Sequence, residues 1–181
     1  RDRNIYAEVN RISPEAPIPV YDAKEMDERP GGAANVEACI NALGCGNIRG
    51  VMVSNGPRAT IKQRVFVDGR MVSRVDFNHV YTPSAKQLLE ICLSLSERSL
   101  VRAVAVADYG YGAVTPTTMG IIKDCFSDVP IVLDPKTVVL DNWSGLHVKM
   151  NRKECEHYCN IAGIATRNLD WLDIAWRMVS E

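Results

Sequence analysis

Two glycines and an asparagine, at Gly31, Gly32 and Asn35, form the first pattern with chemical potential. They precede a stretch with helical spacing, so free backbone N–H groups and the positive end of the helix dipole would face a ligand there. Glycine allows close approach to the backbone, and Asn35 adds a donor and an acceptor. The pattern favours an anionic or hydroxyl-rich ligand, although a diglycine is also typical of a flexible turn.

Polar side chains end three successive strand-like stretches further along the chain. Asp108 ends residues 102–108, Asp134 ends 130–134 and Asn151 ends 146–151. In a parallel α/β sheet the ligand crevice lies outside the carboxyl ends of the strands. We therefore expect these side chains along one functional edge. The alternative is that Asp and Asn only begin the turns that follow.

Charged residues accompany two of these strand ends. Lys136 follows Asp134-Pro135, where it would neutralise a phosphate or pair with the neighbouring carboxylate. Glu154 comes three residues after Asn151, on the same side of the first turn of an expected helix. A carboxylate there could hold hydrated Mg²⁺ beside nucleotide phosphates. It could equally complement the dipole of an ordinary helix start.

Other catalytic motifs are absent from the sequence. It contains no GxxxxGK[ST], HExxH or GxSxG, and GCGNIRG misses the GxGxxG spacing, which weighs against a dehydrogenase-type nucleotide fold. The histidines at 79, 147 and 157 lack a nucleophile partner, so we expect surface or packing roles. The six cysteines form no CxxC and are predicted to be reduced core residues. Cys155 and Cys159 share a helix face from which His157 points away, which argues against zinc.

Composition limits the class of protein. With 181 residues, 46% hydrophobic and 24% charged, the chain fits one globular domain or a fragment of a larger one. A net charge of −1 provides no field that would draw it to nucleic acid or an anionic membrane. No signal peptide or spanning segment is apparent. We expect a cytoplasmic protein without nucleic-acid or membrane partners, and the missing initiator Met suggests a start within a longer reading frame.

The first half of the chain predicts a β-rich lid. Residues 16–23 suit an edge strand. A helix follows Gly32, with an apolar stripe at Val36, Cys39, Ile40 and Leu43, and a short strand is expected at 48–53. The clearest hairpin flanks Asp68-Gly69, the dipeptide that a type I′ turn favours. Its alternating faces are typical of a lid rather than of a central parallel strand.

From residue 82 onward, strands and helices alternate. Helices are predicted from Thr82-Pro83, from Thr115-Pro116, at 152–161 and at 169–180. The apolar run 102–108 is predicted to be a strand buried on both faces, with further strands at 130–134 and 146–151. These patterns together predict an α/β fold, in which helices flank a parallel sheet and a small β-lid is attached.

Several motifs resemble the ribokinase-like (PfkB) carbohydrate kinases. They are Asp2-Arg3, RISPEAPIPV, ERPGGAANV and the hairpin ending SRVDF. ADYGYGAV is similar to SDYAKGAL of the kinases that phosphorylate heptose 7-phosphate on the way to ADP-heptose and lipopolysaccharide. VLDPK resembles their DPK, and MNRKE the superfamily's NxxE. The resemblance runs from residue 2 to about 157, and it is closest to the kinase domain of a bifunctional protein of ADP-heptose synthesis.

The resemblance implies a ribokinase-like, Rossmann-like fold whose C-terminal part is missing. Residues 1–181 would form a single incomplete domain, with a lid from about 5–23 and 60–77 and an α/β core from about 31–54 and 82–181. The implied activity is ATP-dependent phosphorylation of heptose 7-phosphate to heptose 1,7-bisphosphate. Dimers of such kinases often pair through the lid, which would bury the apolar face of residues 61–77.

The resemblance also implies two sets of site residues. The implied substrate-binding residues are Asp2, Arg3, Gly31, Gly32, Asn35, Lys62, Arg64, Asp108 and Lys136. The implied ATP-binding residues are Asn151, Arg152, Lys153 and Glu154, and Glu154 would also hold Mg²⁺.

The chain departs from the family at four places. Tyr111 replaces a lysine, Lys149-Met150 replaces a small residue or Thr-Pro, and the loop SNGPRA replaces a helix and a strand. No GAGD follows Glu154, so the residue that would take the acceptor proton is not in this chain. We expect weak sugar-phosphate binding without turnover. The alternative is a non-catalytic sugar-phosphate-binding or lid-dimerisation module, and a GAGD beyond residue 181 would favour the enzyme.

Overall fold

The computed structural model describes residues 1–44, 59–98, 101–136 and 144–164. These residues form two compact units, Arg1–Tyr81 and Thr82–Glu181. The strand expected at 48–53, the helix expected at 169–180 and Cys45 lie outside the described residues.

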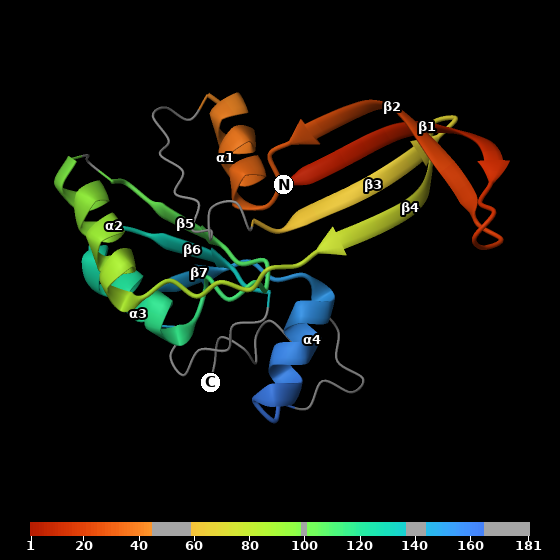
Figure 1. Cartoon of the computed structure of the whole chain (residues 1–181). Helices are drawn as coiled ribbons and strands as arrows, with labels where there is room; N and C mark the ends of the chain where they lie inside the picture. Colours follow the sequence, from red (N-terminus) through yellow and green to blue (C-terminus); the bar gives the residue numbers. More distant parts are fainter. Residues whose placement is uncertain (45–58, 99–100, 137–143, 165–181) are drawn as a thin grey trace. The chain divides into compact units, whose positions relative to one another are not determined.

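The first unit contains a four-stranded sheet (Figure 1). Its strands are β1 (Asp2–Ile12), β2 (Pro19–Arg29), β3 (Ile61–Val67) and β4 (Arg70–Phe77), in the order β2-β1-β3-β4. β1 runs antiparallel to β2 and parallel to β3. The predicted edge strand exists but extends well beyond residues 16–23. β1 provides its partner, and polar and apolar residues alternate through its NIYAEV stretch.

The predicted hairpin is confirmed. β3 and β4 pair antiparallel from Ile61 opposite Phe77 to Val67 opposite Arg70. The two residues between them, Asp68 and Gly69, have φ values of 49° and 73°. A type I′ turn requires positive φ at both central positions, and Asp-Gly meets that requirement at little cost. The turn sets the pairs next to it, and a bulge between Val65 and Phe66 shifts the register by one residue for the rest of the hairpin.

Helix α1 (Ala33–Ala42) follows the diglycine, as predicted. Its apolar stripe is not part of a core. Val36 and Ile40 are half-buried, Cys39 and Leu43 are exposed, and no residue of α1 is fully buried. The spacing of apolar residues predicts the helix and the direction of the stripe, whereas the cover over that stripe depends on neighbouring elements.

The second unit is an α/β structure with a parallel sheet, compatible with the ribokinase-like fold. Its strands β5 (Val104–Ala107), β6 (Ile131–Asp134) and β7 (Leu146–Val148) pair in that order, all parallel. The helices are α2 (Ala85–Arg98), α3 (Pro116–Cys125) and α4 (Arg152–Ile161). Among the described residues, no helix has the length and apolarity to cross a bilayer.

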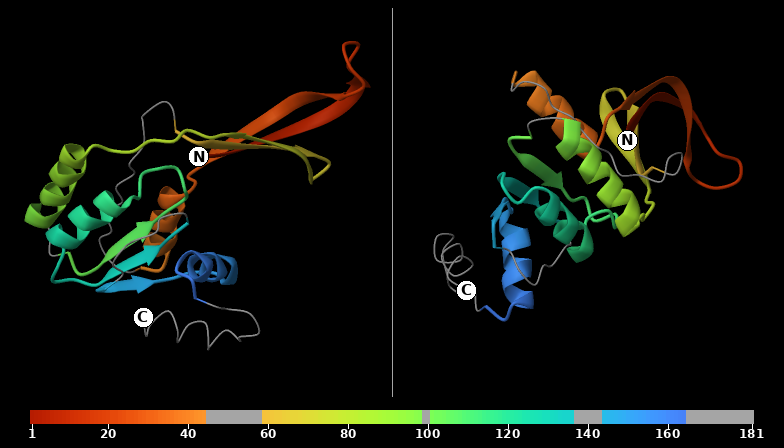
Figure 2. Two further views of the ribbon diagram at one scale, coloured as in Figure 1. Left: turned by 90° about the horizontal axis from the view of Figure 1, so that it is seen from below. Right: turned by 90° about the vertical axis from the view of Figure 1, so that its left-hand side faces the viewer.

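The core of the second unit lies between the sheet and two helices. α2 and α3 lie side by side over one face of the sheet (Figure 2). They bury Leu88, Met119, Ile122, Ile131 and Leu133 in one cluster.

The prediction that residues 102–108 are buried on both faces is wrong for the described residues. Ala105 is exposed, and its partner on β6, Val132, is 40% exposed. Val104 and Val106 point the other way and pack against the core. A continuous apolar run shows that a strand suits burial, but α2 and α3 supply cover for one face only.

The cysteines fall into two classes. Cys92, Cys155 and Cys159 are buried and Cys125 is half-buried, in agreement with the prediction of core thiols. Cys39 is exposed, so the prediction is wrong there. Burial raises the pKa of Cys92 to about 11, and the neighbouring Cys125 adds to the rise. That shift disfavours the reactive thiolate at Cys92.

Candidate functional site

Asp2 and Arg64 form an ion pair on neighbouring strands of the first unit. Arg64 Nη1 lies 2.8 Å from Asp2 Oδ1, and the two side chains are 27% and 30% exposed. In the register of β1 and β3, Asp2 is opposite Lys62 and Asn4 is opposite Arg64, so all four residues share one face of the sheet. This face therefore combines a carboxylate, which can accept hydrogen bonds from hydroxyl groups, with a guanidinium suited to binding phosphate.

The diglycine lies beside this ion pair. A Cβ built on Gly31 would be 2.6 Å from Asp2 Oδ2. Gly32 caps the N-terminus of α1 with φ 55°, a conformation that favours glycine. Asn35 is exposed in the first turn of α1, and its backbone N–H donates to the carbonyl of Gly32. The structure thus brings Gly31 directly to Asp2.

Arg3 lies on the opposite face of β1 from Asp2. Its Nε donates to Glu28 Oε1 at 2.7 Å, and its Nη1 lies 3.4 Å from Gln63 Oε1. The structure therefore separates Arg3 from Asp2 and Arg64, although the resemblance groups the three as substrate-binding residues.

Two charged residues of β4 extend the polar face, and sequence reasoning missed them. Arg74 stands opposite Arg64, and Asp76 stands opposite Lys62. Arg74 Nε and Nη2 donate to Asp76 at 2.7 and 2.6 Å. These hydrogen bonds, with smaller contributions from Lys62 and Arg64, hold the pKa of Asp76 below its ordinary value. The turn alone would place Arg64 opposite Ser73, but a bulge between Val65 and Phe66 shifts the register by one residue, so the turn signal did not reveal this pairing.

In the second unit, Asp108 holds backbone groups at the carboxyl edge of the sheet. Its side chain is buried at 7% exposure. Oδ1 accepts from the Gly110 N–H at 2.8 Å, and Oδ2 accepts from the Lys136 N–H at 3.0 Å. Asp108 thereby ties the loop after β5 to the segment after β6. The Asp108 carboxylate, which the resemblance assigns to substrate binding, therefore has a structural role in the free protein.

Lys136, Asn151 and Glu154 form a connected group at the start of α4. Lys136 Nζ lies 2.7 Å from Glu154 Oε1, while Glu154 Oε2 accepts from the Asn151 N–H at 2.8 Å. Asn151 Oδ1 accepts in turn from the Glu154 N–H at 3.1 Å, which completes a capping box. A residue assigned to substrate is therefore paired with one assigned to metal.

The charges of this pair stabilise each other. Burial by itself would raise the pKa of Glu154, but hydrogen bonds from Lys136 and from the Asn151 backbone hold it below its ordinary value. The hydrogen bond to Glu154 raises the pKa of Lys136. Both groups are consequently charged at neutral pH, and the start of α4 presents a cation and an anion side by side.

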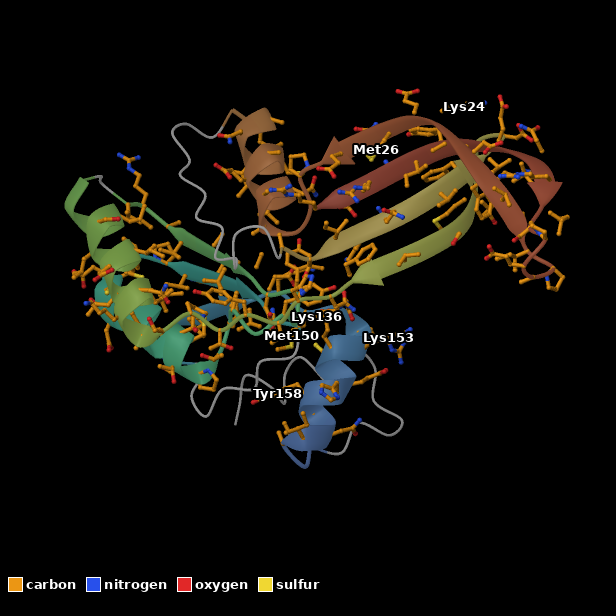
Figure 3. The ribbon with its side chains drawn as sticks, viewed as in Figure 1. Lys24, Met26, Lys136, Met150, Lys153 and Tyr158 are labelled. Atoms are coloured by element: carbon orange, nitrogen blue, oxygen red, sulfur yellow. The ribbon has the colours of Figure 1, made fainter. Side chains whose placement is uncertain are left out.

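The remaining charged residues flank that group. Lys149 Nζ lies 3.1 Å from both carboxylate oxygens of Asp134. Arg152 pairs with Glu156 at 2.8 Å, one turn along α4. Figure 3 shows Lys136 beside the first turn of α4 and Lys153 on the outer side of that turn, where it is exposed. Of the expected strand-end residues, Asp134 is the last residue of β6, while Asp108 and Asn151 come after β5 and β7 of the same parallel sheet.

Comparison with known proteins identifies relatives of the chain. No model of a known protein family matches it. It is 33% identical over 170 residues to the bifunctional protein HldE of Vibrio cholerae and 32% identical to that of Vibrio atlanticus. It is 30% identical over 173 residues to HldE of Coxiella burnetii. Each match covers 80% of this chain and 35% of the relative, so the chain spans about a third of the length of these proteins.

Proposed function

We propose that this chain is the sugar-phosphate-binding part of an ATP-dependent carbohydrate kinase, because 80% of its length is similar to the bifunctional HldE proteins. The proposed reaction is phosphorylation of heptose 7-phosphate to heptose 1,7-bisphosphate. It would serve ADP-heptose and lipopolysaccharide synthesis in the cytoplasm. The observation that carries the proposal is the Asp2–Arg64 pair beside Gly31.

In this proposal the polar face of β1 and β3 receives the acceptor sugar. The carboxylate of Asp2 would accept hydrogen bonds from sugar hydroxyls, while the planar guanidinium of Arg64 would bind the phosphate. In the free protein each neutralises the other at 2.8 Å. Lys62 and Arg74 would add positive charge on the same face, and Asn35 would contribute from the start of α1.

The start of α4 would receive the nucleotide. Its backbone N–H groups and dipole favour phosphates, and Asn151, Arg152, Lys153 and Glu154 stand around that turn. Phosphoryl transfer depends mainly on positioning and charge neutralisation. Lys136 would turn from Glu154 toward the phosphates, because its backbone is anchored by Asp108 while its side chain is held by one ion pair.

Glu154 could hold Mg²⁺ only as a single carboxylate ligand. No group of three or more His, Cys, Asp or Glu side chains within the described ranges could hold a metal ion. Mg²⁺ is often bound through one or two carboxylates together with waters and substrate phosphates, which suits a single glutamate. Bound there, the ion would supply neutralisation of phosphate charge. Glu154 would have to release Lys136 from Oε1 to take part.

The proposal extends to the division of the chain and to its assembly. We propose one ribokinase-like domain, with the lid at about 5–23 and 60–77 and the core at about 31–54 and 82–181. A homodimer through the lid is supported by exposed apolar residues on one face of the sheet, where Met26, Val75 and Phe77 are 61%, 44% and 45% exposed. These residues lie on the face opposite Asp2 and Arg64.

Ligand binding tests the substrate assignment. In thermal-shift titrations of the 181-residue chain, heptose 7-phosphate should stabilise it more than fructose 6-phosphate or ribose. Arg64→Ala should weaken heptose 7-phosphate binding by about 1.5–3 kcal/mol, or roughly 10- to 150-fold. Arg70→Ala, an exposed arginine next to the hairpin turn, should leave binding unchanged. A preference for ribose would contradict the heptose assignment.

A non-catalytic binding module is the second candidate. It is favoured by the engagement of both Glu154 oxygens in the cap and the ion pair. Incubation of the 181-residue chain with ATP, Mg²⁺ and heptose 7-phosphate should give no turnover in either case. A GAGD in an extended reading frame, with activity of the longer chain, would favour the kinase. Turnover by residues 1–181 alone would contradict our expectation for this chain.

A further inference from the structure

The two adjacent glycines of the first unit have different reasons to lack a side chain. Gly32 has φ 55°, so any L-residue there would be strained by its own backbone. Gly31 is not among the residues with positive φ, and its backbone would accept alanine. The obstacle at Gly31 is a neighbouring atom, because a Cβ would lie 2.6 Å from Asp2 Oδ2 and 3.3 Å from the carbonyl carbon of Arg1.

A methyl group at position 31 would have to displace the carboxylate of Asp2. A carbon–oxygen separation of 2.6 Å is well inside ordinary contact distance, so one of the two must move. The main chain has little room, since the Arg1 carbonyl carbon is also close. The carboxylate could leave only by rotation of its short side chain, and that rotation would carry Oδ1 away from Arg64, to which it is bonded at 2.8 Å.

We propose that Gly31 is a positioning residue that acts through Asp2. The absence of a side chain at Gly31 provides the space in which the Asp2 carboxylate lies, and this placement aims Oδ1 at Arg64. In this role Gly31 itself does not need to contact a ligand. The consequence for sugar-phosphate recognition rests on the proposed function, in which Asp2 takes the hydroxyls and Arg64 the phosphate. The steric coupling of Gly31 to Asp2 does not depend on any ligand.

A thermal-unfolding cycle tests the coupling without ligand. Gly31→Ala should lower the Tm by about 4 °C or more when Asp2 is present, and by clearly less in the Asp2→Ala background, where the 2.6 Å contact is removed. Gly32→Ala should lower the Tm equally in both backgrounds, because its strain is in its own backbone. Gly120→Ala, in α3 with no atom within 4 Å of its Cβ, should not lower the Tm.

Equal losses for Gly31→Ala in the two backgrounds would overturn the proposal. If Gly31→Ala alone fails to fold, the double variant decides the question. Folding of Gly31→Ala/Asp2→Ala supports a clash with the carboxylate, whereas failure of the double variant to fold, with Asp2→Ala folded, contradicts it.

Calorimetric titration with heptose 7-phosphate tests the consequence for recognition. Gly31→Ala should weaken binding roughly tenfold or more, as expected for the loss of a positioned charged hydrogen bond. In the Asp2→Ala background it should weaken binding no further, and Gly120→Ala should bind as the parent does. Full affinity of folded Gly31→Ala would overturn the proposed role. No binding by the parent chain would contradict the proposed function, while the unfolding cycle would still decide the coupling.

Discussion

Glu154 serves as a structural residue in the free protein. One carboxylate oxygen accepts from the Asn151 N–H in the capping box, and the other pairs with Lys136. The spacing of Asn151 and Glu154 suits both a helix cap and a nucleotide-binding motif, and the two roles use the same oxygens. Substitutions that separate the cap from the ion pair therefore show how much each contributes.

We predict that Glu154→Ala destabilises the chain more than Glu154→Gln does. Glutamine retains an oxygen for the capping box but loses the charge that pairs with Lys136, whereas alanine loses both. The difference between the two variants should be about 0.5–2 kcal/mol in the free energy of unfolding, measured with urea. Equal losses would show that the cap contributes nothing.

The ion-pair contribution of Glu154 should depend on pH with a defined sign. Because its folded-state pKa is held below the ordinary 4.5, the charged form stabilises the fold above pH 4.5. That contribution should fade as the pH falls from 4.5 through the lower folded-state pKa. The stability gap between the parent and Glu154→Gln should therefore narrow on acidification, and a constant gap from pH 7 to pH 3 would contradict the assignment.

Asp108 should be among the most sensitive residues of the second unit. Asp108→Ala removes the acceptor for the backbone N–H groups of Gly110 and Lys136 at a buried position. We predict a loss of about 2–5 kcal/mol in the free energy of unfolding, from two unsatisfied donors. Asp124→Ala, at an exposed position of α3, should change stability by less than about 0.5 kcal/mol. A similarly small effect at Asp108 would contradict its structural role.

Among the elements, the β3–β4 hairpin depends on the backbone conformation of its turn. We predict that Gly69→Ala destabilises the chain by about 1–2 kcal/mol, because φ is 73° at this residue although no atom lies within 4 Å of its Cβ. Asp68→Asn should be nearly neutral, since Asn-Gly also favours type I′ turns. Urea unfolding measures both effects, and a neutral Gly69→Ala would contradict the turn assignment.

Elements marked by local chemistry were predictable from sequence. Asp-Gly predicted the hairpin, Thr115-Pro116 the start of α3, and Asn151 with Glu154 the start of α4. Thr115 and Asn151 both accept hydrogen bonds from the first turn of the helix they precede. These signals succeed because capping and turn geometry involve only a few neighbouring residues.

Features that depend on contacts between distant segments were not predictable. The exposed face at Ala105 and Val132 depends on where α2 and α3 pack, and the exposure of Cys39 depends on what covers α1. The engagement of Asp108 by backbone groups requires Lys136, 28 residues away, to lie beside it. The placement of Arg3 away from Asp2 follows from strand alternation, but only once β1 is known to be a strand.

At the scale of the whole molecule, the proposed dimer gives a direct test. Val75→Glu places a charge among the exposed apolar residues of the sheet face that carries Met26 and Phe77. We predict that it shifts sedimentation from dimer to monomer, because burying an unpaired charge is costly. Leu89→Glu, at a 43% exposed position of α2, is the matched control and should leave association unchanged. A dimer that persists in Val75→Glu would contradict lid pairing through this face.

The pairing of Arg64 opposite Arg74 has a practical consequence for every such experiment. Each of these guanidinium groups is paired with one carboxylate, Arg64 with Asp2 and Arg74 with Asp76. Inorganic phosphate or sulfate in a buffer would also compete for the same guanidinium groups. Titrations in such a buffer would begin from partly occupied arginines and understate the affinity for a phosphorylated sugar.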